Sequence, residues 1–395
     1  MLKRIEVQEF KSIRNLSIEL GRINLFLGAN GAGKSNILEA MGIISSAAYG
    51  IVDDEALLRR GVRPGVPRLY KTSNKYYDRS PQISFSVASE ECEYKISLLN
   101  PLDNPKPQWN YKTESFSSKN HKEPLYTKGV RSSRNNLSGG IPALLNQLEQ
   151  DSIEFQFIET IRNYAIFNPN TPTLRGIITD LQPRDPVGLS GGGLAEGLVG
   201  LLQKAKNDED YEEAVNDILG LFDWVKNVNS EMSIGTILSK SIARQKRVIT
   251  LIDKYMKDNS NKLTAYDASE GILFVLFIMV LCLSDNSPDI FAVDNIDQTL
   301  NPRLVKNLIN QMHNWFNELI PEKQILCTAH NPAILDGLDF TDDSLHLFMV
   351  DRDSKGLTKV SRVIISEELI KLAKDNKQPL SQLWIEGYLG GVPNV

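Results

Sequence analysis

INLFLGANGAGKSN, residues 23–36, is the stretch that decides the fold. Residues 28–35 fit the pattern GxxxxGK[ST], in which glycines allow several backbone N–H groups to converge on the phosphates of a nucleotide. The alternating apolar residues before the loop predict a strand, and NILEAMGII after it predicts a helix. Because strand, loop and helix are the context that this pattern requires, the sequence predicts a nucleotide-binding site here.

The second half of such a site is expected at the end of a neighbouring strand. Asp294 closes the apolar run Ile290–Val293 and is therefore placed to bind a metal ion. In the hydrolysing ABC-class pattern, a glutamate follows this aspartate and polarises the attacking water. Here the next residue is Asn295, whose amide can hold a water molecule but cannot take its proton. Asp297 is the nearest carboxylate that could substitute for the missing base.

Three segments are candidates for the signature motif. ABC-class ATPases place this motif at the start of a helix, some 20–30 residues before the metal-binding aspartate, which is Asp294 here. LSGG occurs at 137–140 and at 189–192, but neither has this spacing. Ala268-Ser269-Glu270-Gly271 does, since Asp294 lies 25 residues beyond Ser269 (294 − 269). Its helix start predicts a second anion site, and an ordinary helix N-cap is the alternative. This turn is expected to lie too far from the phosphate loop of its own chain, so a two-fold dimer is predicted to close the site.

The sequence resembles the RecF/SMC/Rad50/OLD branch of ABC-class ATPases over about residues 1–45 and 265–350. The segments that carry the resemblance are IEVQEFKSIRNLSIEL (5–20), the phosphate loop, the ASEG helix, FAVDNIDQTLNP (291–302) and TAHNP (328–332). Within the branch, the text around Asp294 and LSQLWIEGYLGG (380–391) resemble stand-alone ATPases of bacterial phage-defence operons, such as the AbiL ATPase component and the PARIS ATPase subunit.

The resemblance implies an α/β fold, namely a P-loop ABC-type ATPase head with a mixed sheet and flanking helices. The residue pattern adds a β-hairpin within residues 82–99 and a large helical insertion. The resemblance also implies ATP and Mg²⁺ as ligands, with Ser35 and Asp294 on the metal and Leu300-Asn301 in the D-loop. His330 becomes the γ-phosphate sensor, and Asn295, Asp297 and His330 become the catalytic candidates. The residues predicted to contact ATP are Gly28, Asn30, Gly31, Ala32, Gly33, Lys34, Ser35 and Asn36, with Ser269, Glu270 and Gly271 acting across the dimer.

Composition and patterning divide the 395 residues into three parts. With 41% hydrophobic residues, 24% charged residues and a formal charge of −5, the chain is typical of globular proteins. We predict the N-terminal half of the ATPase head at 1–103, a basic loop and helical insertion at 104–262, and the C-terminal half of the head at 263–395.

The longest apolar run, Ile272–Leu283, has 12 residues, fewer than the roughly 18–20 that span a bilayer. With no secretory signal visible, a cytoplasmic protein is expected.

Two segments of this acidic chain are locally basic. Residues 56–80 carry a net charge of +6, and residues 104–134 carry +5 with interleaved aromatic residues. Basic segments of this kind predict a contact with nucleic acid or a partner protein, and a solvated loop is the alternative. The residues predicted to make this contact are Arg59, Arg60, Arg63 and Arg68.

The leading functional hypothesis is an ATP-dependent dimerising switch or scaffold of an anti-phage defence system. Its predicted partners are a second copy of the chain and a separate nuclease-like or TOPRIM-like effector. Larger assemblies and DNA binding stay open, and no membrane is expected. Because Asn295 replaces the usual glutamate, ATP hydrolysis is expected to be slow. The alternative is a RecF-like DNA-repair ATPase that binds DNA.

Overall fold

We describe the chain from a computed structural model. The structure describes residues 1–129, 137–233, 245–338, 342–364 and 379–386.

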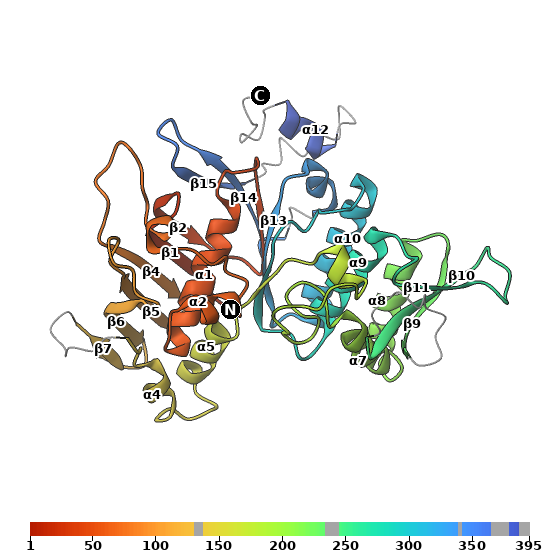
Figure 1. The fold of residues 1–395 in the computed structure, drawn as a ribbon, viewed down its shortest axis with the longest axis horizontal. Coiled ribbons are helices and arrows are strands. Elements are labelled where there is room, and N and C mark those ends of the chain that lie inside the picture. The colour runs from red at the N-terminus through yellow and green to blue at the C-terminus, as the bar shows by residue number, and fades with distance from the viewer. Residues whose placement is uncertain (130–136, 234–244, 339–341, 365–378, 387–395) are drawn as a thin grey trace.

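A six-stranded mixed sheet forms the centre of the molecule, with the strand order β15-β14-β3-β13-β12-β8 (Figure 1). The N-terminal strand β3 lies between two C-terminal strands, β14 and β13, and runs parallel to both. This arrangement confirms the predicted α/β core that the two ends of the sequence build together. Only β15 is antiparallel to its neighbour. The strands are β3 (Ile23–Leu27), β8 (Ile166–Phe167), β12 (Ile290–Val293), β13 (Gln324–Ala329), β14 (Leu345–Arg352) and β15 (Thr358–Val363).

Both faces of the central sheet are buried along β3, β12, β13 and most of β14, which explains why these strands read as mostly apolar runs. Successive side chains point to opposite faces, so Leu25 and Leu27 join one hydrophobic core while Phe26 joins the other. Phe26 stacks on Phe348 of the adjacent strand, with ring centroids 4.9 Å apart. The sheet therefore separates two lobes, each with its own core.

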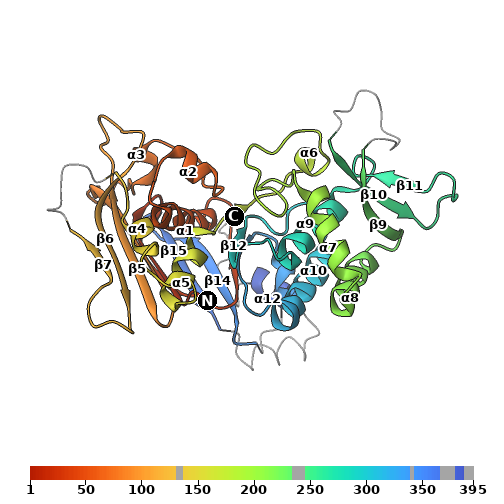
Figure 2. The same cartoon turned by 90° about the horizontal axis from the view of Figure 1, so that it is seen from below.

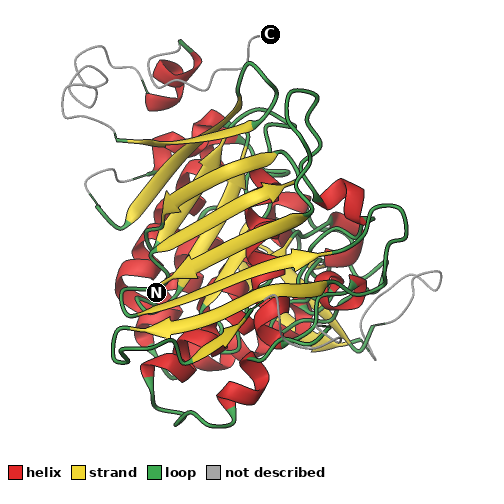
Figure 3. Ribbon diagram, turned by 90° about the vertical axis from the view of Figure 1, so that its left-hand side faces the viewer, coloured by secondary structure: helices red, strands yellow, loops and turns green. Residues whose placement is uncertain are grey.

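The first lobe contains a second six-stranded sheet, which is antiparallel throughout and has the order β2-β1-β4-β5-β6-β7 (Figure 3). The predicted hairpin within residues 82–99 is confirmed as β4 and β5. The prediction of a basic loop from residue 104 is wrong for residues 110–118 and 126–128, which form the strands β6 and β7. Side chains of β6 such as Tyr111 and Phe116 face the core. The strands are β1 (Arg4–Phe10), β2 (Ile13–Glu19), β4 (Gln82–Ala88), β5 (Cys92–Leu99), β6 (Asn110–Ser118) and β7 (Tyr126–Lys128).

Helix α1 (Lys34–Tyr49) packs in the core of the first lobe, whereas α9 (Glu270–Leu283) and α10 (Pro302–Asn314) pack in the core of the second (Figure 2). The helix that starts at the phosphate loop and the helix of the signature motif thus lie on opposite faces of the central sheet. No helix among the described residues has the length and apolarity needed to cross a membrane. The other first-lobe helices are α2 (Asp54–Leu58), α3 (Pro67–Tyr70), α4 (Ile141–Leu145) and α5 (Ile153–Arg162).

Residues 104–262, predicted as one insertion, contribute to both lobes. The helical prediction is wrong for residues 225–232 and 247–253, which form two strands of a three-stranded antiparallel sheet at the far end of the second lobe (Figure 2). The elements of this lobe are α6 (Thr171–Leu174), α7 (Leu194–Ala205), α8 (Glu209–Gly220), β9 (Val225–Met232), β10 (Arg247–Asp253), β11 (Lys262–Thr264), η1 (Trp315–Leu319), η2 (Pro332–Gly337) and α12 (Leu380–Ile385).

Candidate functional site

The phosphate loop leaves β3 at the carboxyl edge of the central sheet and enters α1. Gly33, immediately before the helix, has φ +111°, and a Cβ there would lie 2.1 Å from Thr358 Oγ1. Thr358 donates a hydrogen bond to the Ala32 carbonyl (2.8 Å), and the Arg352 Nε donates to the Gly31 carbonyl (2.9 Å). The hairpin β14–β15 therefore holds the loop, while its tip at Asn30 and Gly31 is exposed.

Lys34 occupies the first position of α1 and is buried. Its Nζ donates to the carbonyls of Gly28 (2.7 Å) and Ala29 (3.0 Å). Burial lowers the pKa of the Lys34 ammonium, whereas the nearby carboxylates of Asp294 and Asp297 act in the opposite direction. This cation is therefore held inside the curl of the loop, where the pattern GxxxxGK[ST] places it against phosphate oxygens.

Ser35 and Asp294 meet directly beneath the loop. The Ser35 hydroxyl lies 3.0 Å from Asp294 Oδ1 and 2.9 Å from Oδ2. Two adjacent oxygen ligands of an octahedral Mg²⁺ ion lie about 2.9 Å apart, since each metal–oxygen bond is about 2.0–2.1 Å. The hydroxyl and the carboxylate therefore fit the first two protein ligands of a magnesium ion.

The turn that follows β12 is tied to the loop that follows β13. The Asn295 backbone, with φ 58°, donates to Thr328 Oγ1 (2.8 Å), and the Thr328 hydroxyl donates to Asp294 Oδ1. Asp297 Oδ2 accepts the backbone N–H groups of His330 (2.9 Å) and Asn331 (2.6 Å). Asn295, Asp297 and His330 are thus brought together with Asp294 at one edge of the sheet.

The predicted signature turn lies at the start of α9. Ser269 is the N-cap residue but makes no side-chain capping bond, and Ser269 and Glu270 are both exposed. Gly271 is half-buried against the turn that precedes α10, because a Cβ there would be in van der Waals contact with Leu300 and Leu304. Within one chain the structure does not bring these residues to the phosphate loop, since α9 packs on the other face of the sheet.

A pocket of about 400 Å³ adjoins Asn36 at the start of α1. Arg63 and Arg68, two of the predicted nucleic-acid contacts, line it, and the charged side chains of its lining are all basic. Arg63 also pairs with the buried Glu39 of α1, at a distance of 2.5 Å. The basic residues of this lining are Lys11, Arg63, Arg68, Lys71 and Arg352.

The other two predicted contacts have different surroundings. Arg60 is only 4% exposed, and its guanidinium donates to Ser45 Oγ (2.7 Å) and to the Ala56 carbonyl (2.8 Å). Burial, together with Arg184 and Arg162, lowers the Arg60 pKa to about 10. The prediction that Arg60 contacts nucleic acid is therefore corrected, because its side chain is part of the core. Arg59 is exposed and pairs with Glu55 one helical turn earlier.

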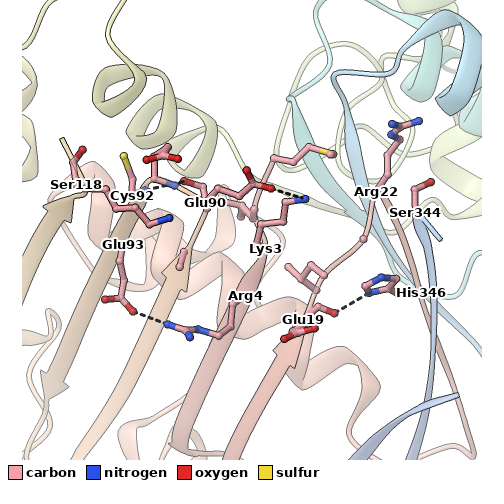
Figure 4. A pocket seen from close by; sticks show the side chains of 18 of the residues that line it. Lys3, Arg4, Glu19, Arg22, Glu90, Cys92, Glu93, Ser118, Ser344 and His346 are labelled. Carbon is pink, nitrogen blue, oxygen red and sulfur yellow. Dashed lines mark hydrogen bonds and ion pairs between the residues drawn. The ribbon is translucent and has the colours of Figure 1, made fainter. Parts of the chain in front are cut away.

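A second pocket, of about 900 Å³, lies at the opposite edge of the central sheet, before β3 and β14 begin (Figure 4). Its lining carries five basic and five acidic side chains. Figure 4 shows two of the ion pairs that neutralise them, Lys3–Glu90 at 3.3 Å and Arg4–Glu93 at 2.9 Å. This pocket has no excess of positive charge for phosphates and contains none of the predicted site residues, so the carboxyl edge is kept as the candidate site.

Comparison with known proteins agrees with this geometry. A family described as "AAA domain, putative AbiEii toxin, Type IV TA system" matches residues 23–336. The chain belongs to this AAA_21 family. The matched region begins at β3 and includes the phosphate loop, the signature turn, Asp294 and His330. The AAA_21 chain is therefore a P-loop ATPase of the AbiEii type.

Solved structures show the fold that this AAA_21 chain shares. An SMC head bound to the C-winged helix domain of ScpA is similar, with a TM-score of 0.53 and 15% identity, over 94% of this chain and 99% of that one. The SMC head with an extended coiled coil from Pyrococcus furiosus, bound to the C-terminal domain of ScpA, has a TM-score of 0.51 and 13% identity, over 95% of this chain and 99% of that one. The predicted fold, that of an ABC-type ATPase head, is thus confirmed.

A curated relative covers part of the AAA_21 chain. The uncharacterized protein MJECL10 of Methanocaldococcus jannaschii is 29% identical over 177 residues, which are 41% of this chain and 72% of that protein.

Sequence reasoning did not find Asn168, which lies at the same edge of the sheet as Asp294 in this AAA_21 chain. Strand β8 runs beside β12, and the Asp294 backbone N–H donates to the Phe167 carbonyl (3.0 Å). Asn168, exposed directly after β8, therefore follows a strand at the edge that carries Asp294. A two-residue strand gives too short an apolar signal to be found from sequence.

The two LSGG segments that the sequence analysis rejected have local roles. Glu114 Oε2 accepts the Gly140 N–H at 2.7 Å, so the first segment docks on β6. In the second, the Ser190 N–H donates to Asp180 Oδ2 at 2.8 Å. Each segment thus binds a carboxylate of its own chain.

Proposed function

We propose that this chain is an ATP-dependent dimerising switch of an anti-phage defence system, in which two ATPase heads close over ATP and act on a separate effector protein. The observation that carries the proposal is the Ser35–Asp294 pair, which lies beneath a fully formed phosphate loop. An oxygen pair of this geometry suits the Mg²⁺ of a nucleotide triphosphate.

The expected ligands of the site are ATP and Mg²⁺. Ser35 and Asp294 would hold the metal ion, which supplies positive charge to the phosphates when it is bound. The loop N–H groups and Lys34 would bind the phosphates. Arg63 and Arg68 line the adjoining basic pocket, so we assign them to the nucleotide rather than to nucleic acid.

Dimerisation is supported by the signature turn. The N-terminus of α9 presents N–H groups that the Ser269 side chain does not cap, and it does so on a different face of the sheet from α1. A helix N-terminus attracts phosphate oxygens. A second copy related by two-fold symmetry could bring this turn to the nucleotide of its partner.

The defence role rests on the family description, which refers to an AbiEii toxin of a type IV toxin–antitoxin system. Abortive defence requires an effector activity. Among the described residues, no group of three or more His, Cys, Asp or Glu side chains is arranged to hold a metal ion for such an activity. We therefore propose that a separate effector carries this activity. We do not extend the proposal to DNA, because Arg60 is buried and we assign Arg63 and Arg68 to the nucleotide.

The dimer is tested with Ser269→Arg. The bulky cation at the start of α9 should prevent MgATP-dependent dimerisation while leaving the affinity of the monomer for a fluorescent ATP analogue within about threefold. Light scattering after size-exclusion chromatography, with and without MgATP, measures the association. Ser260→Arg, at an exposed serine of the β10–β11 turn, is the matched control. Equal dimer formation with and without ATP, in both variants, would contradict the switch.

A further inference from the structure

Asn295 leaves this ATPase without a carboxylate at the position that follows the metal-binding aspartate. A side-chain amide can orient a water molecule, but it has no basic site for the proton that the water loses. Hydrolysis at this site therefore requires an acceptor from another residue at the carboxyl edge of the sheet.

Asp297 is the nearest carboxylate, but its environment does not suit a base that acts on water. Its side chain is 0% exposed, and its Oδ2 is already occupied by the backbone N–H groups of His330 and Asn331. Its other oxygen, Oδ1, is buried and has no hydrogen-bond partner among the described residues. Water outside the protein cannot reach this carboxylate.

His330 has the accessibility that Asp297 lacks. Its side chain is 48% exposed, and its Nδ1 lies 3.3 Å from Asp297 Oδ2. It follows β13, which lies between β3 and β12. His330 therefore lies at the edge of the sheet, after the strand between the one that leads into the phosphate loop and the one that ends at Asp294.

The carboxylate selects the form of the imidazole. A neutral histidine carries one N–H, and a carboxylate beside Nδ1 favours the tautomer in which Nδ1 carries that proton. Nε2 is then unprotonated and can accept a hydrogen bond. A carboxylate that orients a histidine in this way is a recurring arrangement at catalytic and metal sites.

We infer that Asp297 and His330 act as a pair that replaces the missing glutamate, with His330 as the catalytic acceptor and Asp297 as its positioning residue. The inference rests on the proposed function, because it requires ATP on the phosphate loop. The water oxygen bonds to the γ-phosphorus, and a proton of that water passes to His330 Nε2. The bond between the γ-phosphorus and the β–γ bridging oxygen breaks, and its electron pair leaves with ADP.

The inference is tested with Asp297→Asn, which keeps an oxygen for the backbone N–H groups but removes the charge. We expect kcat for ATP hydrolysis to fall about 100-fold, within the range of general-base contributions, with KM changed less than about threefold. His330→Ala should lose a similar factor. The double variant should be no slower than either single variant, because the two residues act as a unit. Asn295→Glu in the Asp297→Asn background should restore most of the rate, since it supplies a carboxylate directly.

A second measurement separates positioning from a general structural role. In protein labelled with ¹⁵N-histidine, the neutral His330 ring should carry its proton on Nδ1 in the unmodified chain and on Nε2 in Asp297→Asn. The His330→Ala spectrum assigns the signal. Asp289→Asn, at the exposed position before β12 begins, is the matched control and should change neither the spectrum nor the rate.

Two results would overturn the inference. One is an Asp297→Asn variant that hydrolyses ATP at the unmodified rate. The other is a variant whose kcat, nucleotide affinity and melting temperature fall together while the His330 tautomer is unchanged. Neither result bears on MgATP-dependent dimerisation of the unmodified chain, so the proposed switch stands or fails separately.

Discussion

At the scale of single residues, burial decides what the arginines between α2 and α3 do. Arg60 ends up inside the first lobe, where its guanidinium donates to Ser45 and Ala56. Arg63, three residues later, keeps 66% of its side chain exposed while it pairs with Glu39. An arginine therefore stabilises the core at one position, whereas at the other it is a candidate ligand for phosphate.

We predict different consequences of removing these side chains. Arg63→Ala and Arg68→Ala should weaken binding of a fluorescent ATP analogue by about 3- to 10-fold each, because each removes a partly exposed charge near the phosphates. Their melting temperatures should change little. Arg60→Ala should instead lower the free energy of unfolding by about 1–3 kcal/mol, because it removes buried hydrogen bonds. A large loss of nucleotide affinity in Arg60→Ala, with unchanged stability, would reverse these assignments.

At the scale of elements, the phosphate loop depends on a hairpin that is more than 300 residues away in the sequence. Ser12 and Thr358 are hydrogen-bonded to each other at 2.6 Å, and Asn36 Nδ2 donates to Ser12 Oγ at 2.7 Å. Thr358 of β15 also holds the Ala32 carbonyl. The turn between β1 and β2, the loop and β15 therefore form one connected unit around the start of α1.

Gly33→Ala tests this unit. The added methyl group would meet the Thr358 hydroxyl at a position with φ +111°, so both sterics and backbone strain oppose it. We expect affinity for MgATP to fall at least about 10-fold, as measured by fluorescence titration. Gly220→Ala, at the end of α8, is the control, because a Cβ there meets no atom within 4 Å. Equal affinities of the two variants would show that the loop accommodates the methyl group.

At the scale of the whole molecule, the central sheet joins two lobes, and the helices α1 and α9, whose starts are the proposed phosphate contacts, pack on opposite faces of it. α1 belongs to the core of the first lobe and α9 to that of the second. The hydrophobic contacts that stabilise the fold therefore keep the two halves of the expected nucleotide site apart within one chain. This is the physical reason to expect association of two copies when ATP is present.

Nucleotide binding should stabilise the whole chain. A ligand that binds only the folded state adds about 2.7 kcal/mol at a concentration 100 times its Kd, so saturating MgATP should raise the melting temperature by several degrees. Lys34→Ala should lose both the shift and the binding, because the buried ammonium is removed from the loop. Lys226→Ala, at an exposed position of β9, should retain the shift. A shift of equal size in Lys34→Ala would place the nucleotide elsewhere.

Much of the site could be predicted because its residues occur in short, ordered segments. GANGAGKS, the apolar run before Asp294 and the segment that contains His330 each signal their own local structure. Asn168 and Thr358 could not be found in this way. Their places beside Asp294 and the phosphate loop depend on neighbours that are remote in sequence, across β8–β12 and between β15 and the phosphate loop.

Local periodicity and loop chemistry, which depend only on neighbouring residues, were sufficient to predict the α/β core, the hairpin at 82–99, the helix after Ser269 and the phosphate loop. They were not sufficient for β6, for β9–β11, or for the burial of Arg60. Whether a basic or mixed segment becomes an inner strand or a solvated loop depends on which distant apolar surface covers it, and that is settled only when the two lobes pack. The pairing of Asp297 with His330 has the same origin, since only the sheet brings the ends of β12 and β13 together.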